Sequence, residues 1–396
     1  MIRRKCPCIV LSQALIENIA NMLFGDFNEP MLRLVFEELA AVPSDVVSTS
    51  YGAFVAVISS GRVVTWGRAG YGGDSSAVAE QLVSGVVRVV ATQGAFAALK
   101  EGGRVETWGS PRNGGDSSQV AGELASGVVE VVATSWAFAA VTEGGRVVTW
   151  GDARWGGDSS AVAGEVASGV VRVVATDYAF AAVMECGRVV TWGGAECGGD
   201  SRRVAGELAS GVVKVVARRY MFAALTDGGR VVTWGVRAGR DSSAVEGRLE
   251  SGVVDVVSTA HAFAAVISGG RVVTWGEAGS GGDSSEVAGA LASGVVRVVA
   301  TGSAFAALTE GGRVVTWGNP HCGGDSSRVA GVLSGMFGYM MMWKRAEYGG
   351  DAWNSWDISR GRVATELGSG VVEVVAVSYK RFVARKKYGQ IIEWGG

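Results

Sequence analysis

The stretch GVVEVVATSWAFAAVTEGGRVVTWGDARWGGD, residues Gly127 to Asp158, recurs along most of the chain with few changes. Its Trp-Gly landmark falls at Trp66, Trp108, Trp150, Trp192, Trp234, Trp275 and Trp317. The spacing is 42 residues, except for 41 between Trp234 and Trp275. A fixed period in this range is typical of a repeat architecture, in which each copy buries its faces against its neighbours. The sequence therefore predicts one periodic array.

Each copy contains three stretches with the composition of β-strands. Val128–Val132 is rich in β-branched residues, Ala137–Val141 is small and apolar, and Arg146–Gly151 ends in Trp-Gly. Glu143-Gly144-Gly145 predicts a hairpin turn between the last two, because glycine tolerates the positive φ that such turns need. The remaining stretch, Asp158–Val166, is compatible with either a short capped helical turn or a fourth strand.

The side-chain pattern predicts which parts of a copy are buried. The middle of the first strand carries a charge of either sign, at Arg88, Glu130, Arg172, Lys214, Asp255, Arg297 and Glu373. Such variation indicates one solvent-facing position in an otherwise buried strand. Small Ala residues around a single Phe indicate that second strands lie where neighbouring copies crowd together. The repeated Trp is expected to fill the space between adjacent sheets.

The two ends of the chain complement each other. Val35–Val47 aligns without a gap on Val120–Val132, and the chain stops at Trp394-Gly395-Gly396, where the next copy would begin. We therefore expect residues 25–47 to complete the last blade of a closed ring, which leaves no free sheet edge. Residues 1–24 form a separate segment with apolar residues at helical spacing over 9–24. It is expected to be an amphipathic helix, either capping the array or binding a partner.

One copy is irregular. It spans about residues 325–350; after Ser334-Gly335 the chain reads MFGYMMMWKRAEYGGD instead of a full set of strands, and a divergent copy follows. The count is eight intact hairpins plus one truncated copy. The fold class predicted is all-β, a β-propeller of seven or eight blades over residues 25–396, with a short N-terminal helical segment.

The pattern VVxVVAxxxAFAALTEGGRVVTWG resembles the repeat of the regulator of chromosome condensation (RCC1) family over nearly all of residues 35–396. The resemblance implies four-stranded blades, usually seven. It also implies one of three roles: guanine-nucleotide exchange on a small GTPase, substrate recognition in a ubiquitin ligase, or an interaction scaffold. The chain departs from the family where it has Ala95-Phe96 in place of a His-Ser/Thr step and Gly115-Asp116-Ser117-Ser118 in place of Gly-Gln-Leu-Gly. It has neither a HECT domain nor an insertion like the family's exchange wedge.

Composition argues against several classes of function. The net charge of −2 gives no general attraction to nucleic acid, and no apolar run reaches the roughly 20 residues that span a bilayer. The five cysteines, Cys6, Cys8, Cys186, Cys197 and Cys322, lack the spacing of a disulfide framework. We expect a monomer without direct nucleic-acid or membrane binding, located inside the cell in the cytoplasm or nucleus.

Catalytic and cofactor sites are not predicted. His261 and His321 lie on different copies, and the chain has no P-loop or dinucleotide fingerprint. An arginine and an aspartate recur in nearly every copy, as Arg146 and Asp158 do. Because they recur whatever the loop content, Arg is expected to flank a turn and Asp to cap one through its own carboxylate, rather than to bind anions or a metal. We expect no enzyme activity, no cofactor and no metal.

The candidate partner-binding residues are those that vary on this near-constant background. They precede the Ala-Phe step or lie between Trp-Gly and Gly-Gly-Asp, and they are Tyr71, Arg112, Trp136, Arg154, Trp155, Tyr178, Arg218, Arg219, Tyr220, Arg237, His261, His321 and Tyr379. Loops on a rigid scaffold often carry recognition, and Trp, Tyr and Arg dominate interface hot spots. The function predicted is a protein-interaction scaffold, with GTPase exchange and ubiquitin-ligase recognition as alternatives.

Overall fold

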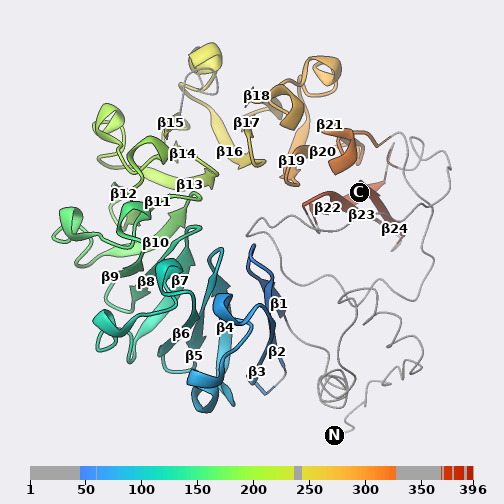
Figure 1. Cartoon of the computed structure of the whole chain (residues 1–396). Coiled ribbons are helices and arrows are strands. Elements are labelled where there is room, and N and C mark those ends of the chain that lie inside the picture. Colours follow the sequence, from blue (N-terminus) through green and yellow to red (C-terminus); the bar gives the residue numbers. More distant parts are fainter. Residues whose placement is uncertain are drawn as a thin grey trace, which may run out of the picture.

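The computed structural model describes residues 45–58, 60–235, 243–326, 367, 370–376, 379–387 and 390–395. These residues form eight three-stranded antiparallel sheets, each made of three consecutive strands. The sheets follow one another around an arc, with the first strand of each nearest its centre and the third farthest from it (Figure 1). The fold is an all-β propeller, as predicted, and the described residues supply eight blades.

The blades are numbered in chain order, and the bounds of their strands are as follows. Blade 1 is β1 (Asp45–Ser48), β2 (Ala53–Val57) and β3 (Val63–Gly67); blade 2 is β4 (Val86–Ala91), β5 (Ala95–Lys100) and β6 (Val105–Gly109); blade 3 is β7 (Val128–Ala133), β8 (Ala137–Thr142) and β9 (Val147–Gly151); blade 4 is β10 (Val170–Ala175), β11 (Ala179–Met184) and β12 (Val189–Gly193). Blade 5 is β13 (Val212–Arg218), β14 (Met221–Thr226) and β15 (Val231–Gly235); blade 6 is β16 (Val253–Ser258), β17 (Ala262–Ile267) and β18 (Arg271–Gly276); blade 7 is β19 (Val295–Ala300), β20 (Ala304–Thr309) and β21 (Val314–Gly318); blade 8 is β22 (Val371–Ala376), β23 (Arg381–Lys386) and β24 (Ile391–Gly395).

Short 3₁₀ helices follow the third strands and take the place of a fourth strand. They are η1 (Ala69–Tyr71), η2 (Ser76–Leu82), η3 (Pro111–Asn113), η4 (Ser118–Val120), η5 (Ala153–Trp155), η6 (Ser160–Val162), η7 (Ala195–Cys197), η8 (Arg202–Val204), η9 (Ser243–Arg248), η10 (Ala278–Ser280), η11 (Ser285–Val287) and η12 (Pro320–Cys322). The stretch left open as helical turn or strand is therefore a helical turn. The described sheets have three strands each, not the four that the family resemblance implies.

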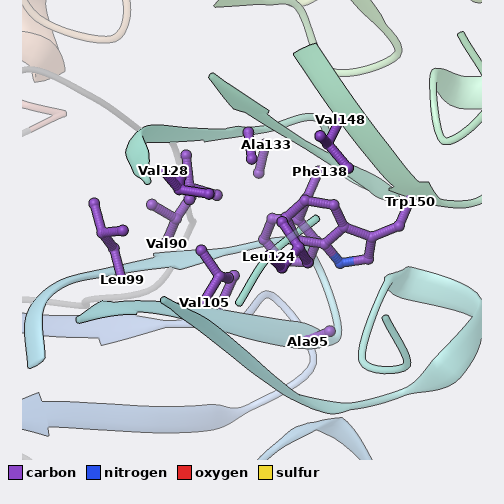
Figure 2. Packing of buried hydrophobic residues seen from close by; sticks show 13 residues of the cluster. Val90, Ala95, Leu99, Val105, Leu124, Val128, Ala133, Phe138, Val148 and Trp150 are labelled. Atoms are coloured by element: carbon purple, nitrogen blue, oxygen red, sulfur yellow. The ribbon is translucent and has the colours of Figure 1, made fainter. Parts of the chain in front are cut away.

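The core lies between neighbouring blades. Figure 2 shows the contact of blades 2 and 3, where Leu99 and Val105 of one blade face Val128, Phe138 and Trp150 of the next. Second strands are the most buried, and Ala137–Val141 is at most 3 % exposed. Among the described residues, blades 2 to 7 each contribute to two such cores and blades 1 and 8 to one, so blades bury their faces against their neighbours. The predicted crowding at the second strand is confirmed.

The repeated Trp joins one blade to the previous one. Trp150 stacks on Phe138 of its own blade, with ring centroids 5.2 Å apart, and its Nε1 donates a hydrogen bond of 3.0 Å to the carbonyl of Gly114 in the preceding loop. Gly114 has φ +88°, and a Cβ there would lie 2.6 Å from the Phe138 ring. The Trp therefore fills the space between sheets, as predicted, and the first Gly of Gly-Gly-Asp is required by that contact.

The turns between second and third strands also tie blades together. The amide of Val170 donates a hydrogen bond of 3.0 Å to the carbonyl of Gly145 in the previous blade. Gly145 has φ +69°, and a Cβ there would lie 2.7 Å from the backbone nitrogens of Gly169 and Val170. The predicted Glu-Gly-Gly hairpin turn is confirmed, and its second glycine has the further task of letting two backbones approach.

The first strands are less buried than the sequence predicts. In β7, Val128 pairs with Thr142 and Glu130 pairs with Val141, so Val129 is the extra residue of a β-bulge. Val129 is 54 % exposed, and the matching valines of β4, β10, β13, β16, β19 and β22 are 46–62 % exposed. The charged position is solvent-accessible, as predicted, but the bulge exposes the valine beside it as well. Across neighbouring blades, Lys214 pairs with Asp255 at 2.6 Å.

Blade 8 packs directly on blade 7. Trp394 Nε1 donates to the carbonyl of Gly323, 71 residues earlier, whereas the other Trp donors reach 36 residues back. The amide of Val314 donates to the carbonyl of Leu367, as the amide of Val147 does to Val166. The irregular copy near 325–350 lies largely outside the described residues, and the blades on either side of it are in contact.

Two predictions about the N-terminus fall mainly on residues that the structure does not describe. Residues 1–24, for which a helical segment is predicted, lie outside them, as do residues 25–44. Asp45–Ser48 is β1 and pairs with β2, so this part of residues 25–47 belongs to blade 1. Completion of the last blade by the rest stays a prediction. Among the described residues, no helix has both the length and the apolar character needed to cross a membrane.

Candidate protein-binding face

A threonine anchors the turn between first and second strands in most blades. Thr134 Oγ1 accepts a hydrogen bond of 2.9 Å from the amide of Ala137 and donates one of 3.1 Å to the carbonyl of Trp155. Thr92, Thr176, Thr259 and Thr301 make the same two contacts. These turns therefore lie against the loops that follow the third strands. We call the surface made by these turns and loops the turn face.

The turns are joined into a chain of backbone hydrogen bonds that runs from blade to blade, here called the belt. The donor and acceptor residues are Tyr51 to Gln93, Gln93 to Ser135, Ser135 to Asp177, Asp177 to Arg219, Ala260 to Gly302, and Gly302 to Tyr379, at 2.7–3.2 Å. Each amide donates to the carbonyl of the next turn. The belt fixes neighbouring turns relative to one another, so the turn face is preorganised.

Two groups of aromatic side chains gather on this face. The first aromatic cluster contains Tyr51, Tyr71 and Trp136, with the ring of Tyr51 4.8 Å from that of Tyr71 and 6.5 Å from that of Trp136. The guanidinium carbon of Arg68 lies 5.4 Å from the centroid of the Tyr71 ring. All three rings are half-buried. The cluster joins blade 1 to blade 3 across the small Gly94, where a Cβ would lie 3.0 Å from Tyr71.

The second aromatic cluster contains Trp155, Tyr178 and Tyr220. Tyr178 lies edge-on to Trp155 at 4.8 Å and stacks on Tyr220 at 5.5 Å with the rings 8° from parallel. Arg154 is 5.9 Å from the Trp155 ring and forms an ion pair of 2.8 Å with Asp152. Burial is the largest cause that raises the pKa of Tyr178. The rings are half-buried, so the cluster offers aromatic surface whose position is already fixed.

The turn of blade 5 continues the second cluster. Arg218, Arg219, Tyr220 and Met221 form a tight turn that lies beside His261 of blade 6 around a small hollow. Nearby, burial raises the pKa of the Asp177 carboxyl, and the positive charges of Arg219 and Arg218 oppose this rise. His261 Nδ1 lies 3.9 Å from Glu277 Oε2. This part of the face is rich in charge.

The structure brings most of the candidate residues together, although their partner-binding role stays a prediction. The first cluster contains Tyr71 and Trp136, and the second contains Trp155, Tyr178 and Tyr220 with Arg154 beside them. One hollow is lined by Arg218, Arg219, Tyr220 and His261. Tyr379 packs on Gly302, and its hydroxyl lies 3.4 Å from Ser303 Oγ. Arg112 in η3 and His321 in η12 are exposed. Arg237 lies outside the described residues.

Sequence reasoning missed three residues of this surface. Tyr51 precedes Ala53 by two positions, just as the candidate Tyr379 precedes Arg381, so alignment of the copies contained the signal. Arg68 belongs to the loop after Trp-Gly from which Tyr71 was chosen. Asp177 had no signal, because its importance comes from the two arginines of the next blade.

The repeated charges have structural partners. Asp116, Asp158 and Asp283 accept a hydrogen bond of 2.8–2.9 Å from the amide two residues later, and these bonds lower the pKa of each carboxyl. Arg146 pairs with Glu123 at 2.5 Å, and Arg230 pairs with Glu207 at 2.8 Å. The predicted turn-capping role of Asp is confirmed. In the part of the chain that the structure describes, no three His, Cys, Asp or Glu side chains gather as metal ligands would.

No protein-family model matches the chain, and no curated protein matches it. Yeast RCC1 (Prp20), solved bound to Kap60, is similar at 16 % identity, with 75 % of this chain and 74 % of that chain covered and a TM-score of 0.38. The ectodomain of the receptor kinase CR4 from Physcomitrella patens is similar at 14 % identity, with 70 % of this chain and 73 % of that chain covered and a TM-score of 0.37. The β-propeller domain of Cps50 (Swd1) from Myceliophteria thermophila is similar at 10 % identity, with 89 % of this chain and 99 % of that chain covered and a TM-score of 0.29. At these TM-scores, the fold rests on the chain's own sheets, and nothing about function follows from the matches.

Proposed function

We propose that this chain is a non-enzymatic scaffold that binds a protein partner through the turn face. The observation that carries the proposal is the pair of aromatic clusters, each with an arginine beside it. Half-buried aromatic rings have lost much of their rotamer freedom before binding, so ordering them in a complex costs little. Tyr, Trp and Arg are also the residues that contribute most to protein interfaces.

The belt supports the same proposal. It holds the turns of neighbouring blades in fixed positions through backbone atoms alone, which leaves the side chains of the turns to vary. A surface of this kind combines a rigid frame with sequence freedom, as recognition loops do. GTPase exchange and ubiquitin-ligase recognition have no specific observation in their favour among the described residues, and both stay predictions, as does an intracellular location.

The test is a capture experiment from cell lysate with the full chain as bait. The variant carries Trp155→Ala and Tyr178→Ala, and the matched control carries Glu143→Ala and Glu185→Ala, which lie exposed at the opposite end of the same two blades. Far-UV circular dichroism and melting temperature establish that both fold. The proposal expects a protein that the wild type and the control capture and the aromatic variant loses.

Two other results would count against the proposal. A captured protein that the aromatic variant keeps in full would place binding elsewhere on the chain. A GTPase that the bait binds without nucleotide and releases when GTP or GDP is added would favour the exchange alternative.

A further inference from the structure

The fifth blade departs from the repeated scaffold at its turn. Six turns begin with a threonine, at Thr49, Thr92, Thr134, Thr176, Thr259 and Thr301, whereas blade 5 has Arg218 and the eighth copy has Val377, which lies outside the described residues. The following strand begins with Met221, where most blades have Ala. In a repeat protein the other copies show what the scaffold itself requires, so Arg218 is a departure that the repeated turn does not need, whereas Met221 is buried in the core between blades 5 and 6.

The backbone departs at the same place. β13 extends to Arg218, which pairs with Met221, so Arg219 and Tyr220 form a two-residue turn. Arg219 has φ +37°, and within the described residues it is the one non-glycine residue with positive φ. The belt bond from Arg219 to Ala260 is also missing there, although every other step along the described turns is made. A strained residue at an interrupted network suggests a functional position.

The hollow at this interruption has a size that limits its occupant. Its volume is about 20 Å³, and Arg218, Arg219, Tyr220 and His261 are among its lining residues. Such a space accepts a group the size of a water molecule or one carboxylate oxygen, not an aromatic ring. Guanidinium groups pair well with carboxylates, and Tyr220 supplies a fixed aromatic wall beside them.

Resting on the proposed function, we propose that an acidic segment of the protein partner binds at the turn Arg218–Met221, with a carboxylate entering the hollow between blades 5 and 6. The guanidinium of Arg219 pairs with that carboxylate. The amide of Arg219 and the carbonyl of Ala260, which lack their belt bond, are the backbone groups next to it. Recognition is local, because the net charge of the whole chain is −2 and does not attract an acidic partner from a distance.

The test uses labelled hexaglutamate as the probe, with hexaglutamine and hexalysine as comparison peptides, in a fluorescence anisotropy titration of the full chain. The site variant carries Arg218→Thr and Arg219→Ser, the residues of the equivalent positions Thr134 and Ser135. The matched control carries Arg202→Ser and Arg203→Ala, which likewise removes two adjacent arginines and inserts the residues that blade 3 has at 160 and 161. Both variants therefore change the net charge by the same amount.

The proposal expects hexaglutamate to bind the wild type and the control alike, at least tenfold more tightly than it binds the site variant, because truncated hot-spot arginines cost tenfold or more in affinity. The melting temperature of the site variant is expected to be no lower than that of the wild type. A second variant, Arg219→Gly, keeps the positive φ without the guanidinium and tests the same point should the first variant fold poorly.

Three outcomes would overturn the proposal: no hexaglutamate binding by the wild type, equal binding by the site variant, or equal binding of hexaglutamine. None of them touches the capture experiment, in which loss of a partner on changing Trp155 and Tyr178 would still support a binding role for the turn face. Conversely, a captured partner that ignores the aromatic clusters would remove the premise, whatever the peptide does.

Discussion

Replacing one repeated tryptophan with phenylalanine should cost more at Trp150 than at Trp275. The two side chains are 5 % and 3 % exposed, and each stacks on a phenylalanine of its own blade at 5.2 and 5.3 Å. The loss of ring area and the cavity left behind are therefore nearly equal. The difference between the sites lies in one hydrogen bond: Trp150 Nε1 donates to Gly114, whereas Trp275 Nε1 finds no acceptor among the described residues.

The size of the difference follows from the environment of Gly114, which is buried. A net hydrogen bond contributes about 0.5–1.5 kcal/mol, and a buried carbonyl left without a donor costs about 1–3 kcal/mol. Trp150→Phe leaves the Gly114 carbonyl without its donor, so the second figure applies, while Trp275→Phe removes a buried donor that has no described partner. We expect Trp150→Phe to lower the free energy of unfolding by about 1–3 kcal/mol more than Trp275→Phe does.

Urea unfolding followed by far-UV circular dichroism measures both variants in the same chain. A repeat array can unfold in stages, so the slopes of the two transitions must agree before the midpoints are compared. Equal losses at the two sites, within about 0.5 kcal/mol, would show that stacking and burial explain the repeated Trp without its hydrogen bond. A larger loss at Trp275 would refute the reasoning outright.

Two further predictions concern the backbone and pH. Gly145→Ala should destabilise the chain by at least about 1–2 kcal/mol, because Gly145 has a positive φ and an added Cβ would clash with the next blade. Gly144→Ala, whose Cβ would meet no atom within 4 Å, should change the stability little. Equal effects of the two substitutions in urea unfolding would exclude the clash. Hydrogen bonds from Arg202 lower the pKa of Asp200 to about 2, so the stabilisation is complete above the unfolded pKa of about 4 and is lost as the pH falls towards 2. The melting temperature should fall over that range, and less steeply in Asp200→Asn; identical pH profiles would show that this carboxylate does not contribute.

Local features of the repeat could be predicted from the sequence because the same residue types recur at the same positions in nearly every copy. The hairpin at Gly145, the Trp between sheets and the capping Asp all follow from residue types with one dominant use. The exposed valines could not be predicted. Val129 and Val131 have the same side chain, and only the β-bulge, a property of backbone pairing, turns the first outward and leaves the second buried.

The candidate face was predictable residue by residue but not as an arrangement. Aromatic and basic residues at variable positions identified most of its members. The belt escaped prediction because it uses backbone atoms of residues as different as Gln93, Ser135 and Asp177, which leave no signature in the side chains. The grouping of Trp155, Tyr178 and Tyr220 depends on contacts between the turns and loops of three blades. The spacing of residues in the sequence does not reveal which loops of neighbouring blades are in contact.

The seam between blades 7 and 8 bears on how such an array can change length over generations. Trp394 reaches Gly323 with the same bond that its counterparts make, and Leu367 takes the place held elsewhere by residues much closer in sequence. Docking of one blade on the next thus depends on a matched pair of surfaces and not on the length of chain that connects them. Unequal recombination within the repeated gene can therefore insert part of a copy at such a junction, and the two flanking blades still pack against each other.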